Sequence, residues 1–345
     1  MRPEAPIRVL VAEDQSFMRI ALRRIIEAEG DMQVVGEARN GIEAVALANQ
    51  LKPDLVTMDV EMPEMGGLEA CQRILAEVSP KPAIVMVSAF TQEGAQATIR
   101  ALRLGAVDFL SKSSLHVATD LAQIDAELRP KLRAWARRGV AVAPLAVAPA
   151  VEFARRHGWI PDLLLIGAST GGPQALTALL KALGPVAPPI VIALHMPEFF
   201  TASFAEILGQ DTGCTVREGS HREKLAPGVV TLLPGGKDGV IGPAAGGGYE
   251  LRLVKIDASF HPNADALFES AAMIAARPVG IVLTGMGEDG ARGATALRRK
   301  QAPILVQEPT TCIVGGMPEA VIAAVPEAVV RSLDGIADLL RFWLG

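Results

Sequence analysis

The hydrophobic pattern of the first 135 residues alternates between short apolar runs and longer amphipathic stretches. Short apolar runs are typical of buried strands, whereas apolar positions three or four residues apart are typical of helices that cover a sheet. The predicted strands are 7–12, 33–37, 55–58, 83–88 and 107–110, and the predicted helices are 16–28, 41–51, 67–78, 94–104 and a last one to about 135. This alternation predicts a doubly wound α/β domain, a parallel sheet with helices on both faces.

A similar alternation begins again at residue 163. An apolar run over 163–168 precedes a helical pattern over 174–183, and buried-strand runs follow at 190–194 and 279–284. Between the halves, residues 139–150 are rich in alanine, valine and proline, which favours an extended, semi-stiff connector. We predict a first α/β domain over 1–136, a linker over 137–160 and a second doubly wound domain over 161–345.

Polar side chains follow the predicted strands of the first half. Glu13 and Asp14 follow the first strand, Asp59 ends the third, Ser88 ends the fourth and Lys112 follows the fifth. The carboxyl ends of parallel strands share one edge of the sheet, so these side chains should meet there. Carboxylates that converge on one edge repel each other unless a hard cation such as Mg²⁺ lies among them. Asp59 is then a candidate metal-assisted phosphoryl acceptor.

The first half resembles the receiver domains of bacterial response regulators, which have a flavodoxin-like fold. The resemblance rests on VAED at 11–14, MDVEMP at 58–63 and GAVDFLSK at 105–112. It implies that Asp59 accepts a phosphoryl group from a chemotaxis histidine kinase. It also implies a Mg²⁺ ion held by Asp14, Asp59 and the backbone carbonyl of Glu61, with Glu13 assisting through water.

The same resemblance assigns two residues to the switch. Lys112 would pair with the phosphoryl group, and Ser88 would move to hydrogen-bond it. The chain departs from the usual receiver pattern at Glu13, where Asp is commoner, and at Gly66, where Asp normally caps the next helix. The first departure keeps the charge, and the second removes a capping carboxylate without removing the phosphoryl acceptor.

A Gly-x-Ser-x-Gly motif over 167–171 follows the first apolar run of the second half. A strand, a tight turn and a helix that opens with Pro173 are the context in which this motif exposes a nucleophilic serine, here Ser169. Backbone N–H groups at the start of the helix would then be free to bind an oxyanion. By itself the stretch is equally compatible with a glycine-rich turn that binds phosphate or nothing.

A nucleophilic serine needs a base and an acid that orients the base. His195 follows the strand 190–194, on the same edge as Ser169, and Asp289 follows the strand 279–284. The segment 285–290 also spells Gly-x-Gly-x-x-Gly, but a dinucleotide site there would place Glu288 and Asp289 where the pyrophosphate lies. We therefore interpret Asp289 as the carboxylate that holds the Nδ1–H of His195.

The order Ser169, His195, Asp289 differs from that of α/β-hydrolases, in which the acid precedes the histidine. With the motifs IGASTGG at 166–172, LHMP at 194–197 and LTGMGEDG at 283–290, the second half resembles the chemotaxis protein-glutamate methylesterases. Those proteins also carry an N-terminal receiver domain, so the resemblance covers nearly the whole chain. It implies a Rossmann-like catalytic domain.

The resemblance further implies a phosphorylation-activated esterase. The reaction is hydrolysis of glutamate γ-methyl esters, and deamidation of selected glutamines, on the cytoplasmic helices of chemoreceptors. Ser169, His195 and Asp289 would be catalytic, and the backbone amides of Thr170 and Met286 would hold the oxyanion. No metal is expected to take part in ester hydrolysis.

Two further positions depart from the family's pattern. Asp238 stands where members commonly have His after the Pro-Gly-x-Lys turn, and 261–265 reads HPNAD where members have His-Arg-Pro-Ser-x-Asp. We expect both to line the approach of the substrate, so that these changes weaken docking of an acidic receptor helix.

Composition narrows the class of protein. A formal net charge of -5 and the lack of a dense basic run argue against nucleic-acid binding. Three widely spaced cysteines, Cys71, Cys214 and Cys312, indicate neither a disulfide framework nor a zinc site. No signal core or membrane-length apolar run is evident, which predicts a cytoplasmic protein without membrane insertion.

Two alternatives to the chemotaxis esterase stay open. One is a receiver-linked esterase or amidase that acts on another protein, and its only support is the altered residues at 238 and 261–265. The other is a catalytically weak adaptor that docks receptors, which the presence of Ser169, His195 and Asp289 disfavours.

Overall fold

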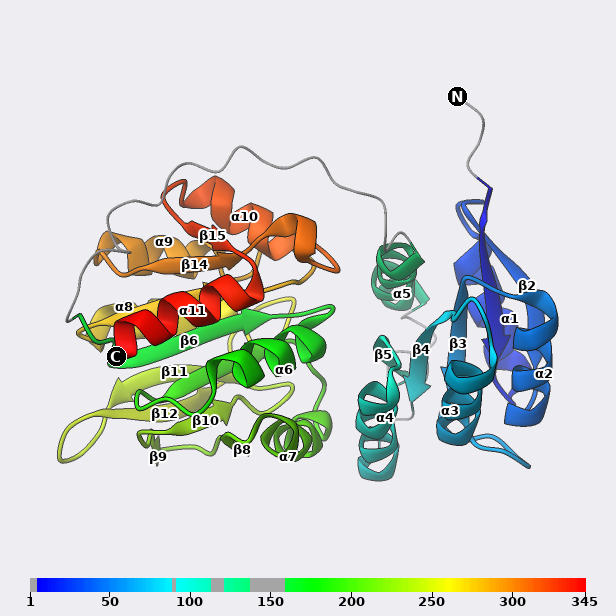
Figure 1. Ribbon diagram of the computed structural model, residues 1–345, viewed down its shortest axis with the longest axis horizontal. Coiled ribbons are helices and arrows are strands. Elements are labelled where there is room, and N and C mark those ends of the chain that lie inside the picture. The colour runs from blue at the N-terminus through cyan, green and yellow to red at the C-terminus, as the bar shows by residue number, and fades with distance from the viewer. Residues whose placement is uncertain (1–4, 89–90, 113–120, 137–158) are drawn as a thin grey trace. The chain divides into compact units, whose positions relative to one another are not determined.

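The computed structural model describes residues 5–88, 91–112, 121–136 and 159–345. The chain forms two compact units, Met1–Val140 and Ala141–Gly345, and each unit has its own parallel sheet (Figure 1). The prediction of two parallel-sheet α/β units is therefore confirmed. Most of the predicted linker, 137–158, lies outside the described residues.

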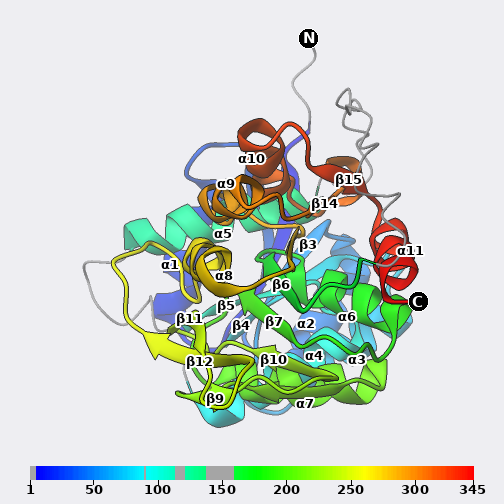
Figure 2. The same ribbon diagram turned by 90° about the vertical axis from the view of Figure 1, so that its left-hand side faces the viewer.

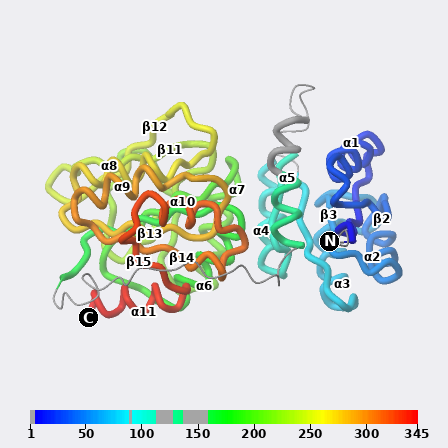
Figure 3. The backbone as a smooth tube through the Cα atoms, turned by 90° about the horizontal axis from the view of Figure 1, so that it is seen from above, coloured from blue at the N-terminus to red at the C-terminus, as the bar shows by residue number. Residues whose placement is uncertain are grey.

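The first unit is a five-stranded parallel sheet with strand order β2-β1-β3-β4-β5. Helices α1 and α5 pack together, while α2, α3 and α4 pack side by side (Figure 3). The elements are β1 (Ile7–Ala12), α1 (Ser16–Glu27), β2 (Met32–Ala38), α2 (Gly41–Leu51), β3 (Leu55–Asp59), α3 (Gly67–Glu77), β4 (Ala83–Ser88), α4 (Gln92–Leu104), β5 (Asp108–Ser111) and α5 (Leu121–Ala136). The strand order reverses at β1, which puts the ends of β1 and β3 beside each other.

The second unit has a seven-stranded parallel sheet with strand order β15-β14-β13-β6-β7-β10-β8. Its elements from β6 to β10 are β6 (Leu163–Ala168), α6 (Gly172–Leu183), β7 (Ile190–Leu194), α7 (Phe200–Thr212), β8 (Thr215–Glu218), β9 (Glu223–Lys224) and β10 (Val229–Leu232). Those that follow are β11 (Asp238–Pro243), β12 (Tyr249–Val254), α8 (Ala264–Ile274), β13 (Pro278–Val282), α9 (Ala291–Arg299), β14 (Ile304–Gln307), η3 (Pro309–Thr311), α10 (Gly316–Ala324), β15 (Val329–Arg331) and α11 (Leu333–Leu344).

The helices of the second unit cover both faces of this sheet. Helices α6 and α11 pack together on one face, and α8, α9 and α10 pack on the other (Figure 2). An additional antiparallel sheet, β11-β12-β9, was not predicted from the hydrophobic pattern. It matters for the site because the chain passes from β12 directly into the loop 255–263 that precedes α8.

The first strand of the second unit lies between two later strands. β6 pairs with β7 on one side and with β13 on the other. Ala168 at the end of β6 is the register partner of Leu194, and Gly167 is the partner of Val282. The residues after these three strands therefore emerge at one edge, where ligands of doubly wound sheets bind.

Short polar side chains begin several helices. Asn40 accepts a hydrogen bond from the Glu43 amide at α2, and Thr91 accepts one from Gly94 at α4. Helix α3 follows Gly66 instead, which has an extended backbone and no capping side chain. The expected loss of a capping carboxylate at Gly66 is therefore confirmed.

Gly67 brings the start of α3 directly against the end of β3. A Cβ atom at this position would lie 1.8 Å from the carbonyl oxygen of Asp59, whereas one at Gly66 would lie 3.5 Å from its nearest neighbour, the carbonyl oxygen of Val60. A separation of 1.8 Å is far below van der Waals contact, and the backbone at Asp59 would have to shift.

We therefore expect Gly67→Ala to lower the free energy of unfolding by about 1–3 kcal/mol, the usual cost of overpacking. Gly66→Ala is the matched control, because its φ of −72° suits any residue and its Cβ has room. Urea unfolding of the full chain, with amide exchange in β3 as the local readout, measures both. Equal stability of the two variants would contradict the proposed contact.

Candidate functional site

Ser169 lies in a tight turn between β6 and α6. The Ser169 amide donates to the carbonyl of Thr284 at 3.0 Å, and its carbonyl accepts from the Gly172 amide at 2.7 Å. Gly171 has a φ of 76°, and a Cβ there would lie 2.7 Å from Ile313. Positive φ and close approach together require glycine at this turn. The predicted strand–turn–helix context is confirmed.

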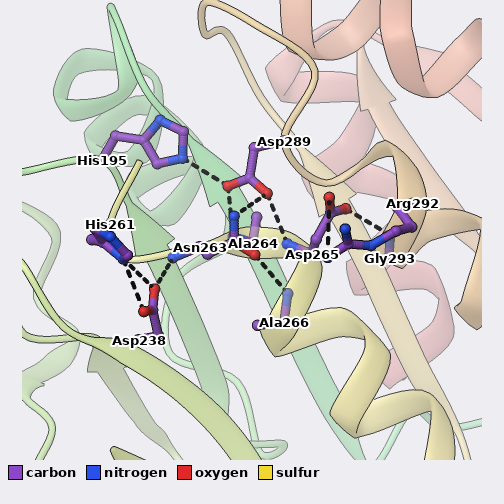
Figure 4. Close-up of polar contacts among 10 residues, drawn as sticks. All are labelled: His195, Asp238, His261, Asn263, Ala264, Asp265, Ala266, Asp289, Arg292 and Gly293. Atoms are coloured by element: carbon purple, nitrogen blue, oxygen red, sulfur yellow. Dashed lines mark hydrogen bonds and ion pairs between the residues drawn. The ribbon is translucent and has the colours of Figure 1, made fainter. Parts of the chain in front are cut away.

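The imidazole of His195 is paired with the carboxylate of Asp289. The Nε2 atom lies 2.7 Å from Asp289 Oδ2, and both side chains are buried (Figure 4). The predicted partnership of the two residues is present, but the predicted atom, Nδ1, is wrong. Nδ1 is instead buried without a hydrogen-bond partner among the described residues. It is thus the nitrogen available to accept a proton.

The carboxylate of Asp289 is held at the start of α8. Oδ2 accepts from the Ala264 amide at 2.7 Å as well as from His195, and Oδ1 accepts from the Asp265 amide and the side chain of Asn263, both at 2.9 Å. Burial alone would raise the pKa of Asp289, but the bonds from His195 and the two amides outweigh it and lower that pKa below its ordinary value. The ionised form is therefore the stable one.

Ser169 and His195 lie next to each other at the sheet edge. Each follows directly after one member of the Ala168–Leu194 register pair, and the His195 amide donates to the carbonyl of Ala168 at 3.0 Å. In the described part of the chain, the Ser169 hydroxyl itself forms no hydrogen bond. The structure thus joins His195 to Asp289 directly and places Ser169 on the neighbouring strand end.

The two predicted oxyanion donors have free backbone N–H groups. Neither the Thr170 amide nor the Met286 amide has a hydrogen-bond partner among the residues that the structure covers. Gly285 packs against Ser169, because a Cβ on Gly285 would lie 2.8 Å from that of Ser169. The loop of Met286 thus begins beside the serine. The oxyanion role of these amides stays a prediction.

The prediction that Asp238 lines the approach of a substrate is wrong. Asp238 is 0% exposed, and Asn263 and Asp265 are also buried. The Asp238 carboxylate accepts from His261 Nδ1 at 2.8 Å and from the Asn263 amide at 2.9 Å (Figure 4). The carboxylate of Asp238 is therefore bonded within the protein and is not exposed to a substrate.

Two residues of this loop were missed by the sequence reasoning. Asn263 contacts Asp289, and Phe260 stacks on His195 with ring centroids 5.1 Å apart and an interplanar angle of 8°. Asn263 also accepts from the Ala266 amide and so caps α8. An Asn directly before an apolar helical pattern is a recognisable cap signal, whereas the sequence offers no comparable signal for Phe260.

The first unit brings its acidic residues together as predicted. Carboxylate oxygens of Glu13, Asp14 and Asp59 lie within 4.8 Å of one another. Lys112 Nζ lies 2.7 Å from Asp59 Oδ2 and 2.9 Å from Glu13 Oε2. One ammonium group thus pairs with two of the three clustered carboxylates, and a divalent cation would balance the remaining negative charge.

Electrostatics in this cluster favour bound positive charge. Burial, followed by repulsion from Asp59, raises the pKa of Glu13 to about 7. Burial also raises the pKa of Asp59. Burial opposes the charge on Lys112, but its bonds to both carboxylates raise the pKa of the ammonium group overall. The donor set consists of hard oxygens, which fits Mg²⁺.

The other predicted receiver residues lie around this cluster. Ser88 is buried at the end of β4, whose register pairs it with Ser111 immediately before Lys112. The Glu61 amide lies 3.3 Å from Asp59 Oδ1, while its side chain is exposed and is not part of the acidic cluster. The proposed roles of Ser88 and of the Glu61 carbonyl stay predictions.

Two families match the chain in the order of its units. Residues 9–120 match the response regulator receiver domain, and residues 164–340 match CheB methylesterase. The fold and sites thus define a response regulator whose output unit is a hydrolase. The chain belongs to the CheB methylesterase family.

The matches to named relatives cover nearly the whole chain. Protein-glutamate methylesterase/protein-glutamine glutaminase 1 of Caulobacter vibrioides is 40% identical over 346 residues, covering 97% of this chain and 98% of the relative. The corresponding protein 2 of Cupriavidus pinatubonensis is 39% identical, covering 93% and 91%. The CheB methylesterase catalytic domain of Thermotoga maritima is 30% identical, covering 52% of this chain and 98% of that domain, with a TM-score of 0.48. None of the helices described here is long and apolar enough to cross a membrane.

The lowered pKa of Asp289 predicts a pH-dependent contribution to stability. A depressed pKa stabilises the folded state above the unfolded value of about 3.9, and this contribution is lost as the pH falls through the folded pKa. Asp289→Asn should therefore lower the free energy of unfolding by roughly 2–4 kcal/mol at pH 7, because amides that bound a carboxylate would face an NH₂ group. The difference from the wild type should shrink below pH of about 4.

Urea unfolding of both proteins between pH 3 and 7 measures this difference. Because the two chains differ at one residue, acid effects on the rest of the molecule cancel in the comparison. If the difference in free energy of unfolding between the two proteins stays constant from pH 3 to 7, the partners of Asp289 do not lower its pKa.

Proposed function

We propose that this protein is a phosphorylation-activated protein-glutamate methylesterase and protein-glutamine deamidase that acts on the cytoplasmic helices of chemoreceptors. One observation carries the catalytic part of the proposal. The His195–Asp289 pair leaves Nδ1 of His195 buried and unpartnered at the strand end next to Ser169. A base held by an ionised acid, beside a half-buried serine in a turn, is the arrangement that acyl transfer requires.

In the first half of the reaction, Ser169 attacks the γ-carbonyl carbon of a glutamate methyl ester. His195 Nδ1 takes the hydroxyl proton, while Asp289 stabilises the resulting imidazolium through Nε2–H. The free amides of Thr170 and Met286 would hold the negative charge that develops on the carbonyl oxygen. Collapse of the tetrahedral intermediate breaks the bond to the methoxy oxygen, His195 protonates that oxygen, and methanol leaves.

In the second half, water hydrolyses the acyl-enzyme. His195 Nδ1 takes a proton from the attacking water and returns it to Ser169 Oγ as the ester bond breaks. The products are a glutamate side chain and the regenerated serine. A glutamine substrate follows the same steps, with ammonia as the leaving group in place of methanol.

The first unit would control this activity through Asp59. Its carboxylate is the proposed nucleophile toward the phosphoryl group of a histidine kinase, with Ser88 and Lys112 contacting the group afterwards. Glu13, Asp14, Asp59 and the Glu61 carbonyl would hold Mg²⁺, which when bound supplies charge neutralisation for phosphoryl transfer. Lys112 already contacts Asp59 and so supports a role in neutralising the phosphorylated side chain.

The alternative of an esterase for an unrelated protein loses its support. That alternative depended on altered residues at 238 and 261–265 as part of the approach to the cleft. Asp238, Asn263 and Asp265 are buried and bonded within the protein, so they give no reason to assign a different substrate.

We expect Ser169→Ala to lower kcat for methanol release by at least about a thousandfold, because removal of a nucleophile disables the whole catalytic unit. The assay follows methanol release from membranes that carry methyl-labelled receptors. Ser220→Ala, which changes an exposed serine after the edge strand β8, is the matched control and should retain full activity. Residual turnover above a few per cent of wild type would rule out the serine mechanism.

We expect Asp59→Asn to remove both phosphoryl incorporation from labelled acetyl phosphate and the increase in methanol release that the donor causes, because the amide cannot form the acyl phosphate. Asp54→Asn is the control. Asp54 lies just before the same strand, at its opposite end, and its carboxylate accepts from the Arg8 amide. Unchanged stimulation in the Asp59 variant would mean that another residue accepts the phosphoryl group.

A further inference from the structure

Asp238 is a fully buried carboxylate at the start of β11, away from the serine motif in sequence. Its two oxygens accept hydrogen bonds from three groups of one loop, the segment 255–263 between β12 and α8. The Ile256 amide lies 3.2 Å from Oδ2, His261 Nδ1 lies 2.8 Å from Oδ2, and the Asn263 amide lies 2.9 Å from Oδ1. One side chain therefore binds the loop near its beginning and at two positions near its end.

The same loop contacts both members of the histidine–aspartate pair. Asn263 donates from Nδ2 to Asp289 Oδ1 at 2.9 Å, on the oxygen that His195 does not use. Phe260 stacks on the imidazole of His195 and is 47% exposed. A ring so exposed is not held by core packing, so its position depends on the backbone of the loop.

We infer that Asp238 is a positioning residue for the hydrolysis, acting through the loop 255–263 on His195 and Asp289. This inference rests on the proposed esterase function. Asp238 holds Asn263 against the carboxylate and Phe260 against the imidazole, and so restricts the orientation of both catalytic side chains. Misplacement of a catalytic group by about 1 Å is enough to lower a rate by up to about a hundredfold.

The burial of Asp238 gives a physical reason for the loop 255–263 to keep its position. Release of the loop would leave the Asp238 carboxylate buried without its donors, which is costly for an ionised group. The His261 side chain, which is 28% exposed, bonds to this carboxylate through Nδ1. Asp238, a departure of this chain from the family's pattern, is thus paired with His261, the first residue of the second segment that departs from it.

The test uses the full chain with Asp238→Asn and His261→Ala. Asparagine keeps the size of the side chain but replaces one acceptor by a donor, so it cannot accept all three bonds. We expect kcat for methanol release to fall about tenfold in either variant while KM changes less than about twofold, because the loop acts on the reacting groups and not on substrate docking.

Asp162→Asn is the matched control for a general loss of stability. Asp162 precedes β6 at the end opposite Ser169 and accepts from the Arg277 amide and the Tyr249 hydroxyl. Its variant should lower the thermal midpoint but leave kcat unchanged. If kcat falls no further in the Asp238 and His261 variants than in this control, or if KM rises alone, the inference is wrong.

A double-mutant cycle tests the route through Asn263. Asn263→Ser keeps a capping oxygen for α8 but removes the donor to Asp289. If Asp238 acts through Asn263, the effects of the two changes on kcat should be less than additive. Full additivity would show that Asp238 does not act by this route.

A second readout separates this inference from the proposed substrate. A fluorophosphonate reacts with an activated serine without any receptor, so its rate of reaction with Ser169 reports on the His195–Asp289 pair alone. A slower reaction in the Asp238 and His261 variants supports the positioning role even if receptor esters prove not to be the substrate. An unchanged rate in both variants overturns it.

Discussion

The buried carboxylate of Asp289 joins the separate parts of the proposed catalytic unit. It accepts from His195 directly after β7, from the first amides of α8 and from the cap residue Asn263. Without these donors a carboxylate so buried would favour its neutral form, and with them it stays ionised. The bonds that position α8 on the sheet are therefore the same bonds that prepare the base. In the proposed mechanism, both stability and catalysis depend on this one carboxylate.

Glycine residues allow the neighbouring backbone segments to approach α8 closely, which makes this arrangement possible. A Cβ at Gly167 would lie 2.9 Å from Ala264, and one at Gly293 would lie 2.6 Å from Phe268. These contacts let α8 come near the end of β6 and the first turn of α9, close enough for its amides to reach Asp289. Glycine in the strand and at the helix contact thus serves the site as well as the packing.

The two units use the same edge of a parallel sheet for different chemistry. In the first, three carboxylates and one lysine converge, and excess negative charge favours a hard cation. In the second, one carboxylate is bonded by backbone amides and an imidazole, and the other ring nitrogen has no hydrogen-bond partner among the described residues. The difference follows from the number of acids at the edge, since in both units this edge is formed by the carboxyl ends of parallel strands.

Much of this site could be predicted from sequence, because residues after parallel strands must share an edge. That rule was sufficient for Ser169, His195 and Asp289, and for Glu13, Asp59 and Lys112 in the first unit. The nitrogen that meets Asp289 and the burial of Asp238 could not be predicted. Both depend on a ring rotation and on how the loop 255–263 closes over the sheet, and neither leaves a periodic signal. The sequence alone determined which groups gather at the edge, and tertiary packing decided which atoms face each other.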